Sequence, residues 1–278
     1  MSKDAGGRRP ELGAPAVLDG LSTRCLGQRV AYYETTDSTN AVAKELAREG
    51  AAEGTLVIAE EQTAGRGRLG RPWLAPSGTS LLFSLIFRPR LEPARAAALT
   101  MVCGLGVREA IREMTALSAQ LKWPNDILLR GRKAGGILTE VSTSGERLDW
   151  AVVGIGLNVN LAVAALPAEF GATSLQEELG RSTLRVPLLQ HILLRIEQRY
   201  LGLQAGQWPT SEWASALETL GQRVQLCTVE GAVEGLAEAV DEQGALALRL
   251  DDGRLLKVWA GDLVALPSSR AAPGAAKS

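Results

Sequence analysis

Cysteine and histidine are scarce in this sequence, which excludes several kinds of site. Its 278 residues include three cysteines and one histidine. Cys25, Cys103 and Cys227 lie far apart, so their spacing predicts neither a disulfide framework nor a zinc site on paired cysteines. A histidine-based triad would have to use His191, which lies in an apolar helical pattern without a supporting motif. We therefore expect no metal site built by the chain itself, and chemistry that relies on Lys, Arg, Asp and backbone groups.

Long hydrophobic runs and an excess of one charge are also missing. No segment approaches the roughly 18 uninterrupted apolar residues of a membrane span, and the N-terminus lacks the apolar core of a signal peptide. Thirty basic residues against 31 acidic ones give a formal net charge of −1, and aromatic residues make up only 4%. This balance argues against a chain held on nucleic acid by bulk charge. We expect a cytoplasmic protein with no membrane segment and no nucleic-acid partner.

The chain is long enough for one large domain and one small domain. Hydrophobic residues make up 46% and charged residues 22%, which is ordinary for a globular protein with a sizeable core. We expect a flexible leader at residues 1–24, a large domain at 25–220, a small β-barrel at 221–267 and a disordered tail at 268–278.

Local patterns mix strands and helices in the large domain. Strands are predicted at 30–33, 54–60, 80–87, 120–123, 127–129, 136–141 and 150–159, and helices at 40–48, 93–114, 184–203 and 211–220. After residue 222 the pattern changes to short strands at 224–229, 235–240, 245–250 and 255–258, separated by turn signals. The fold class is therefore α+β, with a mixed sheet followed by a small barrel.

The strongest local motif is the segment Gly-Arg-Gly-Arg-Leu-Gly-Arg-Pro-Trp at residues 65–73, between two predicted strands. Its glycines let the backbone approach a ligand closely, and its arginines can bind phosphate oxygens through bidentate hydrogen bonds. Trp73 could cover a flat ring. A merely solvated loop, or one that contacts nucleic acid, is the alternative. The segment is not a Walker A motif, because no Gly-Lys-Ser/Thr follows.

Three further motifs are weaker. Lys122-Trp123-Pro124-Asn125-Asp126 reads as a turn between strands, and Lys133 precedes a Gly-Gly pair at the start of an apolar strand, where its ammonium could face an anion. Gly154-Ile155-Gly156-Leu157-Asn158 places glycines inside a strand, which suggests close approach of something to the backbone. Ser38-Thr39-Asn40 is the weakest motif, because a plain helix cap is its favoured explanation.

Taken together and in this order, these motifs resemble the biotin–protein ligase family. The resemblance rests on Ser38-Thr39-Asn40, on Gln62 with the Gly/Arg loop and Trp73, on residues 122–126, on Lys133 with Gly136, and on Gly154 to Asn158. Each motif alone is weak, but five of them in one order are specific. The resemblance in sequence motifs is strong over residues 30–160. The rest of the chain resembles the family only in its predicted domain order, since the family has a mixed-sheet catalytic domain followed by an SH3-like barrel.

The resemblance implies an ATP-dependent ligase. Such an enzyme forms biotinyl-5′-adenylate from biotin and ATP, with Mg²⁺ accompanying ATP, and passes biotin to a lysine of a biotin carboxyl carrier protein. It implies catalytic roles for Lys133, between the biotin carboxylate and the α-phosphate, for Arg68 at the phosphate, and for Asp126, which would orient cations or the incoming lysine. Whether the enzyme is a monomer or a homodimer stays open.

The resemblance also implies a set of binding residues. Ser38, Thr39 and Gln62 would hold the ureido head of biotin. Arg66, Gly67 and Arg68 would wrap the carboxylate and the phosphate, with Trp73 near the adenine. The predicted set is completed by Asn40, Gly65, Lys133, Gly136, Gly156 and Asn158.

Two other functions compete with this interpretation. A lipoate–protein ligase shares the fold and the type of reaction, but the Arg-rich loop with Trp73 and the C-terminal barrel favour biotin. A non-enzymatic module that grips RNA or DNA through the Gly/Arg loop is opposed by the near-neutral charge and the few aromatics. Some family members carry an N-terminal helix-turn-helix domain and repress transcription. Only about 25 residues precede the first predicted strand, too few for such a domain, so we expect the form without the repressor function.

Overall fold

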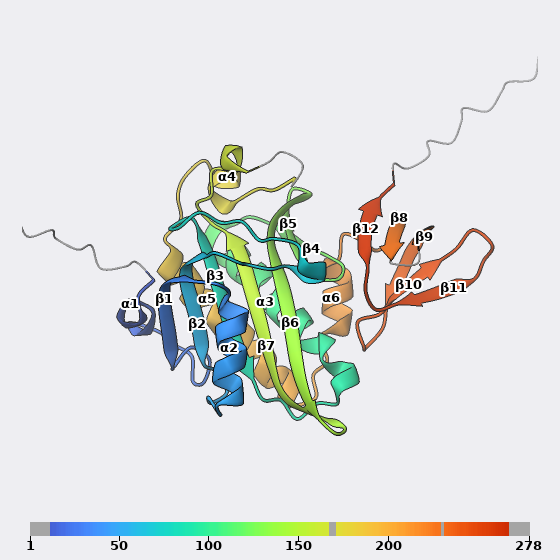
Figure 1. The fold of residues 1–278 in the computed structure, drawn as a ribbon. Coiled ribbons are helices and arrows are strands. Elements are labelled where there is room, and N and C mark those ends of the chain that lie inside the picture. The colour runs from blue at the N-terminus through green and yellow to red at the C-terminus, as the bar shows by residue number, and fades with distance from the viewer. Residues whose placement is uncertain (1–11, 167–170, 229–230, 267–278) are drawn as a thin grey trace, which may run out of the picture.

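The computed structural model of the protein describes residues 12–166, 171–228 and 231–266. A seven-stranded mixed sheet forms the centre of the large domain, in the order β1-β2-β3-β7-β6-β5-β4 (Figure 1). Strands β1 and β2 are parallel, and every other neighbouring pair is antiparallel. The strands are β1 (Val30–Thr36), β2 (Leu56–Gln62), β3 (Ser80–Phe87), β4 (Ala119–Lys122), β5 (Asp126–Leu129), β6 (Arg132–Ser144) and β7 (Arg147–Asn158). The predicted α+β class is confirmed.

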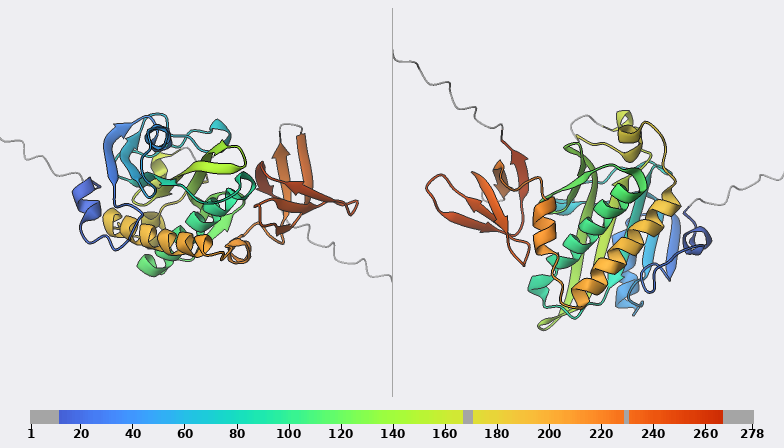
Figure 2. Two further views of the ribbon diagram at one scale, coloured as in Figure 1. Left: turned by 90° about the horizontal axis from the view of Figure 1, so that it is seen from below. Right: turned by 180° about the vertical axis from the view of Figure 1, so that it is seen from behind.

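Helices cover both faces of this sheet. Helices α3 (Ala97–Thr115) and α5 (Arg185–Gln204) lie side by side on one face, and α2 (Thr39–Arg48) crosses the other (Figures 1 and 2). Successive side chains of a strand point to opposite faces. On β2, Leu56 and Ile58 accordingly belong to the core cluster under α3 and α5, whereas Val57 belongs to the smaller cluster under α2. None of the helices in the described ranges is long and apolar enough to span a membrane.

The predicted flexible leader is wrong for residues 12–24. Leu12 and Val17 are fully buried, and α1 (Ala14–Leu18) packs against β1 and α5. The carboxylate of Glu197 on α5 accepts hydrogen bonds from the backbone N–H groups of Arg24, Cys25 and Leu26, at 2.7, 2.7 and 2.9 Å. Burial and these hydrogen bonds order the segment, and their partners lie more than 170 residues away along the chain. Residues 1–11 and the predicted tail at 268–278 lie outside the described residues.

The C-terminal unit is a five-stranded antiparallel sheet in the order β11-β10-β9-β8-β12. It is consistent with the SH3-like barrel that the resemblance implies. Its strands are β8 (Arg223–Thr228), β9 (Gly231–Val240), β10 (Leu246–Arg249), β11 (Leu255–Val258) and β12 (Asp262–Ala265). The sequence patterns missed β12, which has only four residues, and the short helix α4 (Leu175–Leu179), and they extended α6 (Thr210–Ala216) beyond its end.

The two units are joined through Trp123, which is 1% exposed. Its indole Nε1 donates a hydrogen bond of 2.9 Å to the carbonyl of Gly244, in the turn before β10, and its backbone N–H donates to the hydroxyl of Thr219 at 3.0 Å. This contact seats the C-terminal sheet beside α6 and β4, as Figure 1 shows. The turn between β4 and β5 thus holds both units together.

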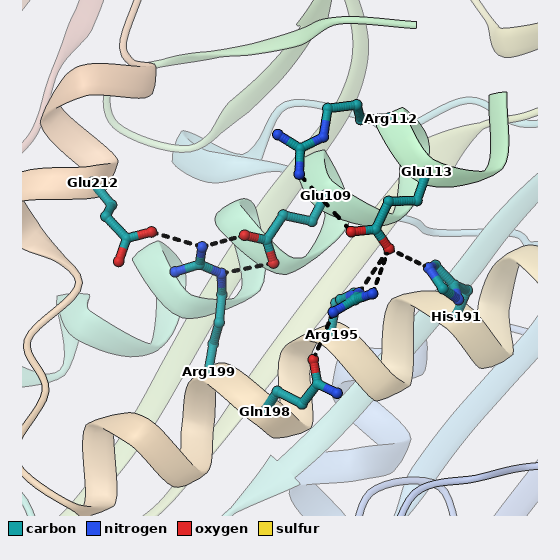
Figure 3. A network of polar contacts seen from close by, with 8 residues as sticks. All are labelled: Glu109, Arg112, Glu113, His191, Arg195, Gln198, Arg199 and Glu212. Atoms are coloured by element: carbon teal, nitrogen blue, oxygen red, sulfur yellow. Dashed lines mark hydrogen bonds and ion pairs between the residues drawn. The ribbon is translucent and has the colours of Figure 1, made fainter. Parts of the chain in front are cut away.

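A polar network on the outer faces of α3, α5 and α6 contains the single histidine of the chain (Figure 3). His191 Nε2 lies 2.6 Å from the carboxylate of Glu113, and Arg195 lies 2.7 Å from the same group. The hydrogen bond with His191, together with the charge of Arg195, lowers the pKa of Glu113 despite partial desolvation. His191 therefore serves the packing of two helices, on the opposite face of the sheet from α2.

Candidate active site

A cavity of about 700 Å³ lies on the large domain where it meets the C-terminal sheet. The start of α2, the end of β2, the Gly/Arg loop, β5, β6 and β7 contribute to its lining, as do residues of the C-terminal unit. The predicted site residues other than Gly65 all line it: Ser38, Thr39, Asn40, Gln62, Arg66, Gly67, Arg68, Trp73, Asp126, Lys133, Gly136, Gly156 and Asn158. The fold therefore brings together motifs that are spread over 120 positions of the sequence.

At one end of the cavity, Gln62 and Thr39 are hydrogen-bonded to each other. The amide oxygen Oε1 of Gln62 accepts hydrogen bonds from the backbone N–H of Thr39 at 2.7 Å and from its hydroxyl at 3.1 Å. A backbone N–H can only donate, which fixes the orientation of the Gln62 amide. Ser38 occupies the N-cap position of α2, but its side chain makes no capping hydrogen bond, so the plain helix-cap interpretation does not account for this motif.

Asn40 forms part of the floor at the same end and is 6% exposed. Its Nδ2 group donates to the carboxylate of Glu140 at 2.8 Å and to the carbonyl of Leu138 at 3.2 Å. A Cβ atom built at Gly154 on the neighbouring strand would lie 2.0 Å from Asn40 Oδ1. The glycine is thus required because the Asn40 side chain occupies the space where a Cβ would stand.

The Gly/Arg loop folds into a short hairpin beside the cavity. The N–H of Trp73 donates to the carbonyl of Gly65 at 2.9 Å, and the N–H of Gly67 donates to the carbonyl of Arg71 at 2.7 Å. Leu69 adopts a positive φ of 55° at the tip. Gly65 is tightly packed, because a Cβ there would come within 2.9 Å of the Trp73 carbonyl and 3.0 Å of Gln62 Nε2. Gly65 therefore shapes the loop, and it is not among the residues that line the cavity.

The indole of Trp73 lies on the two glycines of the central strands. A Cβ at Gly156 would approach the indole to 2.6 Å, and one at Gly136 to 3.4 Å. These two glycines face each other across β6 and β7. The sequence predicts both as site residues, because a glycine inside a strand indicates that another group lies close to the backbone. In the structure this group is the indole of Trp73.

Lys133 and Asp126 form an ion pair inside the cavity. The Nζ atom of Lys133 lies 2.6 Å from Asp126 Oδ1 and 5.8 Å from the centre of the Trp73 ring. Lys133 lies within β6, next to a β-bulge in the pairing with β5. Ile127 pairs with Gly135, and the next residue, Leu128, pairs with Lys133, so the pairing skips one residue of β6. Such a bulge changes the direction of a side chain. The chain reverses between the two strands at Arg130 and Gly131, which both have positive φ angles.

A buried carboxylate that the sequence analysis missed holds the segment beside Lys133. Glu178 has a side chain that is 1% exposed, and it lies 2.7 Å from Arg132 and 3.2 Å from Arg130. It also accepts a hydrogen bond of 2.7 Å from the hydroxyl of Thr173. The backbone of Lys133 pairs with that segment, since its carbonyl accepts from the N–H of Thr173 at 2.8 Å. Only tertiary contacts show this role, because no local motif surrounds Glu178.

Two buried polar atoms among the described residues of the cavity have no hydrogen-bond partner: the indole Nε1 of Trp73 and Oδ1 of Asn158. The Nδ2 group of Asn158 donates to the carbonyl of Thr173 at 3.0 Å. The first atom is a donor and the second an acceptor. Since buried polar groups are normally paired, both fit contacts with a polar ligand.

The C-terminal unit closes one side of the cavity. The lining includes Thr219, Gln222, Val224, Gly261, Leu263 and Val264. None of these carries a group with obvious chemistry, which is why sequence patterns did not mark them. Their contribution is to enclose the space next to Lys122 and Asp126.

Comparisons with known proteins match both units of the chain. The model of the biotin/lipoate A/B protein ligase family matches residues 32–158, and the model of the biotin protein ligase C-terminal domain matches residues 219–264. The bifunctional ligase/repressor BirA of Bacillus subtilis is 36% identical over 91% of this chain and 79% of its own length. The chain belongs to the biotin/lipoate A/B protein ligase family.

Other members of this family align over nearly their full length. The biotin–[acetyl-CoA-carboxylase] ligase of Paracoccus denitrificans is 37% identical over 79% of this chain and 93% of its own length. The structure of the biotin protein ligase of Aquifex aeolicus in complex with biotin and ATP superposes with a TM-score of 0.71. It is 31% identical and covers 87% of this chain and all of that one.

Proposed function

We propose that this member of the family is a biotin–protein ligase that forms biotinyl-5′-adenylate from biotin and ATP and transfers biotin to a lysine of a biotin carboxyl carrier protein. The observation that carries this proposal is the composition of the cavity. Its lining combines the hydrogen-bonding groups of Gln62 and Thr39 with the Lys133–Asp126 ion pair and the arginines of the Gly/Arg loop. Groups that suit a polar head and groups that suit an anionic centre match the two parts of biotinyl-adenylate.

Binding of biotin is assigned to the end formed by α2 and β2. Gln62, Thr39 and Ser38 take the ureido head, and Asn40 supports them from below through its contacts with Leu138 and Glu140. The carboxylate of biotin then points toward Lys133. A cyclic urea has adjacent N–H and C=O groups, which suits a site that contains both donors and acceptors.

Binding of the phosphate is assigned to the Gly/Arg loop, through Arg66, Gly67 and Arg68. Guanidinium groups bind phosphate oxygens in a bidentate manner, and glycine lets the backbone approach. Trp73 covers the adenylate side of the cavity, above Gly136 and Gly156. Asn158 Oδ1 and Trp73 Nε1 supply an acceptor and a donor for the nucleotide.

The first half-reaction needs positive charge that is fixed before the reaction starts. An oxygen of the biotin carboxylate attacks the α-phosphorus of ATP, the bond from that phosphorus to the bridging oxygen breaks, and pyrophosphate leaves. Two anions meet in this step, so Lys133 and Arg68 stabilise the transition state more than the separated reactants. Asp126 holds the Lys133 ammonium in place through their 2.6 Å ion pair.

In the second half-reaction, the amine of the carrier lysine attacks the carbonyl carbon of the mixed anhydride, and AMP leaves. This amine is protonated near neutral pH, because the pKa of a free lysine is about 10.4. It must lose a proton before it attacks. Asp126 is 23% exposed and is the carboxylate next to Lys133, so we assign to it the orientation of the incoming lysine.

Magnesium enters the proposal as a companion of ATP. Mg²⁺ in nucleotide sites is usually bound by one or two carboxylates together with phosphates and water. Asp126 and Glu218 line the cavity and can contribute carboxylate oxygens. The described residues contain no group of three or more His, Cys, Asp or Glu side chains arranged to hold a metal. When bound with ATP, the ion would be held largely by the phosphates, with Asp126 or Glu218 as carboxylate ligands, and would supply positive charge against the negative charge of the phosphates.

Location and assembly complete the proposal. We place the enzyme in the cytoplasm, as a monomer or homodimer that acts on a protein carrier and binds no nucleic acid. The near-zero net charge supports the last point, since bulk basic charge is what holds most proteins on nucleic acid.

The nearest competing function, lipoate–protein ligation, differs in the acid that is activated. The match of residues 219–264 to the biotin protein ligase C-terminal domain favours biotin. Pyrophosphate release from ATP, measured with biotin and then with lipoate at equal concentrations, separates the two. We expect release with biotin alone, whereas release with lipoate alone would replace the proposal by its competitor.

A further inference from the structure

A buried hydroxyl lies beneath the end of the cavity that is proposed for the biotin head. Ser84 on β3 is fully buried and does not line the cavity. Its hydroxyl donates to Asn40 Oδ1 at 2.6 Å and to Thr39 Oγ1 at 2.8 Å. It stands opposite Gly154 in the sheet, where the missing Cβ leaves room for the Asn40 amide. A polar side chain at such a buried position needs an explanation beyond packing.

The direction of each hydrogen bond in this network follows from the partners. Both N–H groups of Asn40 are used, by Leu138 and Glu140, so its oxygen faces Ser84 and can only accept. The single proton of Ser84 is therefore shared between Asn40 and Thr39. The hydroxyl proton of Thr39 in turn points to Gln62 Oε1.

The directions of these hydrogen bonds decide which donors and acceptors remain for a ligand in the cavity. The oxygen of the Gln62 amide is occupied by Thr39, so its Nε2 group remains as a donor for the ligand. The proton of the Thr39 hydroxyl is occupied by Gln62, so its oxygen offers the ligand only a lone pair. A donor thus stands beside an acceptor. A cyclic urea, with a C=O next to an N–H, complements this pair, whereas a dithiolane ring offers neither group.

We propose that Ser84 is a positioning residue that holds the Thr39 hydroxyl so that it presents a lone pair beside the Gln62 amide, and that this arrangement selects a cyclic urea as the head of the substrate. This inference rests on the proposed function, because it names what makes the site specific for biotin. Without the Ser84 hydroxyl, the Thr39 side chain is free to turn and can offer a ligand its proton in place of a lone pair, while the backbone N–H of Thr39 still holds the Gln62 amide.

Calorimetric titration of Ser84→Ala with biotin and with 2-iminobiotin, in which C=NH replaces the ureido C=O, tests this proposal. We expect the Kd for biotin to rise about 10-fold, in line with the loss of one buried hydrogen bond that leaves its acceptors unpaired. The KM for ATP and kcat should change less than twofold. The ratio of the Kd for 2-iminobiotin to the Kd for biotin should fall, because a Thr39 hydroxyl that can turn adapts to the altered head.

The matched control is Thr55→Val, which removes another buried hydroxyl, bonded to the carbonyl of Ala52 and away from the cavity lining. It should leave both Kd values unchanged. If Ser84→Ala does not fold, Ser84→Cys keeps a weak donor and should give an intermediate ratio. An equal loss for both ligands would show a general structural defect and overturn the proposal, as would unchanged binding of biotin. Failure of the unaltered protein to bind biotin would instead contradict the proposed function.

Discussion

Lys133 and Asp126 lie 2.6 Å apart, Nζ to Oδ1, on two strands of one hairpin. Next to the bulge in this hairpin, the lysine side chain reaches into the cavity, 5.8 Å from the centre of the Trp73 ring, and the carboxylate holds the ammonium there. A cation held in this way needs no reorganisation when negative charge develops on the reacting phosphate. The pair therefore links the geometry of the sheet to the chemistry of the first half-reaction.

Replacing Lys133 should nearly abolish adenylate formation and leave the fold intact. Loss of a fixed positive partner of a developing anion typically lowers the rate by about 100-fold or more. Biotin-dependent exchange between pyrophosphate and ATP in Lys133→Ala measures this effect. Lys257→Ala is the control, because Lys257 pairs with Asp241 on the C-terminal sheet and does not line the cavity. Unchanged exchange in a folded Lys133→Ala protein would remove this residue from the mechanism.

Replacing Arg68 should weaken retention of the adenylate more than binding of biotin. Hydrogen bonds to charged groups contribute about 1.5–3 kcal/mol, so the affinity for biotinyl-adenylate should fall roughly 10- to 100-fold in Arg68→Ala. Biotin alone offers its carboxylate, which Lys133 can still bind. Calorimetric Kd values for both ligands settle the point. A loss of equal size for both would assign Arg68 to biotin and not to the phosphate.

Gly156→Ala should displace the indole of Trp73, because the added Cβ would come within 2.6 Å of it. The three nearest atoms all belong to the indole, so Trp73 must move to admit the methyl group. We expect the KM for ATP to rise about 10-fold with a smaller change for biotin, a loss of about 1.4 kcal/mol on the nucleotide side. Gly104→Ala in α3 is the control, since its Cβ would meet side-chain carbons at ordinary contact distances of 3.4 Å or more. A normal KM for ATP in Gly156→Ala would separate Trp73 from nucleotide binding.

Much of the site could be predicted because its residues act through local chemistry. The glycines of β6 and β7, the turn before Asp126 and the Gly/Arg loop are all recognisable from a few neighbouring residues. Gly65 is predicted among the binding residues, but it is not among the residues that line the cavity, and it packs tightly against Trp73 and Gln62. A glycine in such a loop shows that space is limited but not on which side the ligand lies.

The features that the sequence patterns missed depend on partners far away in the chain. Glu178 becomes a support of the Lys133 segment only through Arg130, Arg132 and Thr173. Ser84 becomes part of the site only through α2, more than 40 positions earlier. The leader was expected to be flexible because its composition is rich in Gly and Pro, but Glu197 on α5 binds its backbone.

Glu197 also gives the fold a predictable dependence on pH. Its burial raises the pKa, but the hydrogen bonds from the backbone N–H groups of Arg24, Leu26 and Cys25 outweigh this effect and lower it. A carboxyl group whose pKa is lowered in the folded state stabilises the fold above its unfolded pKa, about 4.3 for glutamate, and this contribution is lost as the pH falls through the folded pKa.

Glu197→Gln should therefore lower the free energy of unfolding at pH 7 by about 1.5–3 kcal/mol, as expected for hydrogen bonds to a charged group. The difference in the free energy of unfolding between Glu197→Gln and the unaltered protein should shrink below pH 4. Urea denaturation at both pH values measures it, with Glu238→Gln on the exposed face of β9 as the control. A difference that is the same at pH 7 and below pH 4 would contradict the proposed role of the charge.

The most direct test of the whole account is the intact mass of a biotin carboxyl carrier domain after incubation with this protein, ATP, Mg²⁺ and biotin. A parallel sample contains a carrier in which the acceptor lysine is replaced by arginine. We predict that the unaltered carrier gains the mass of one biotinyl group, that the lysine-to-arginine carrier gains none, and that Lys133→Ala yields no modified carrier on the same time scale. A carrier that keeps its original mass while ATP and biotin are present would contradict the assignment of this cavity to biotin ligation.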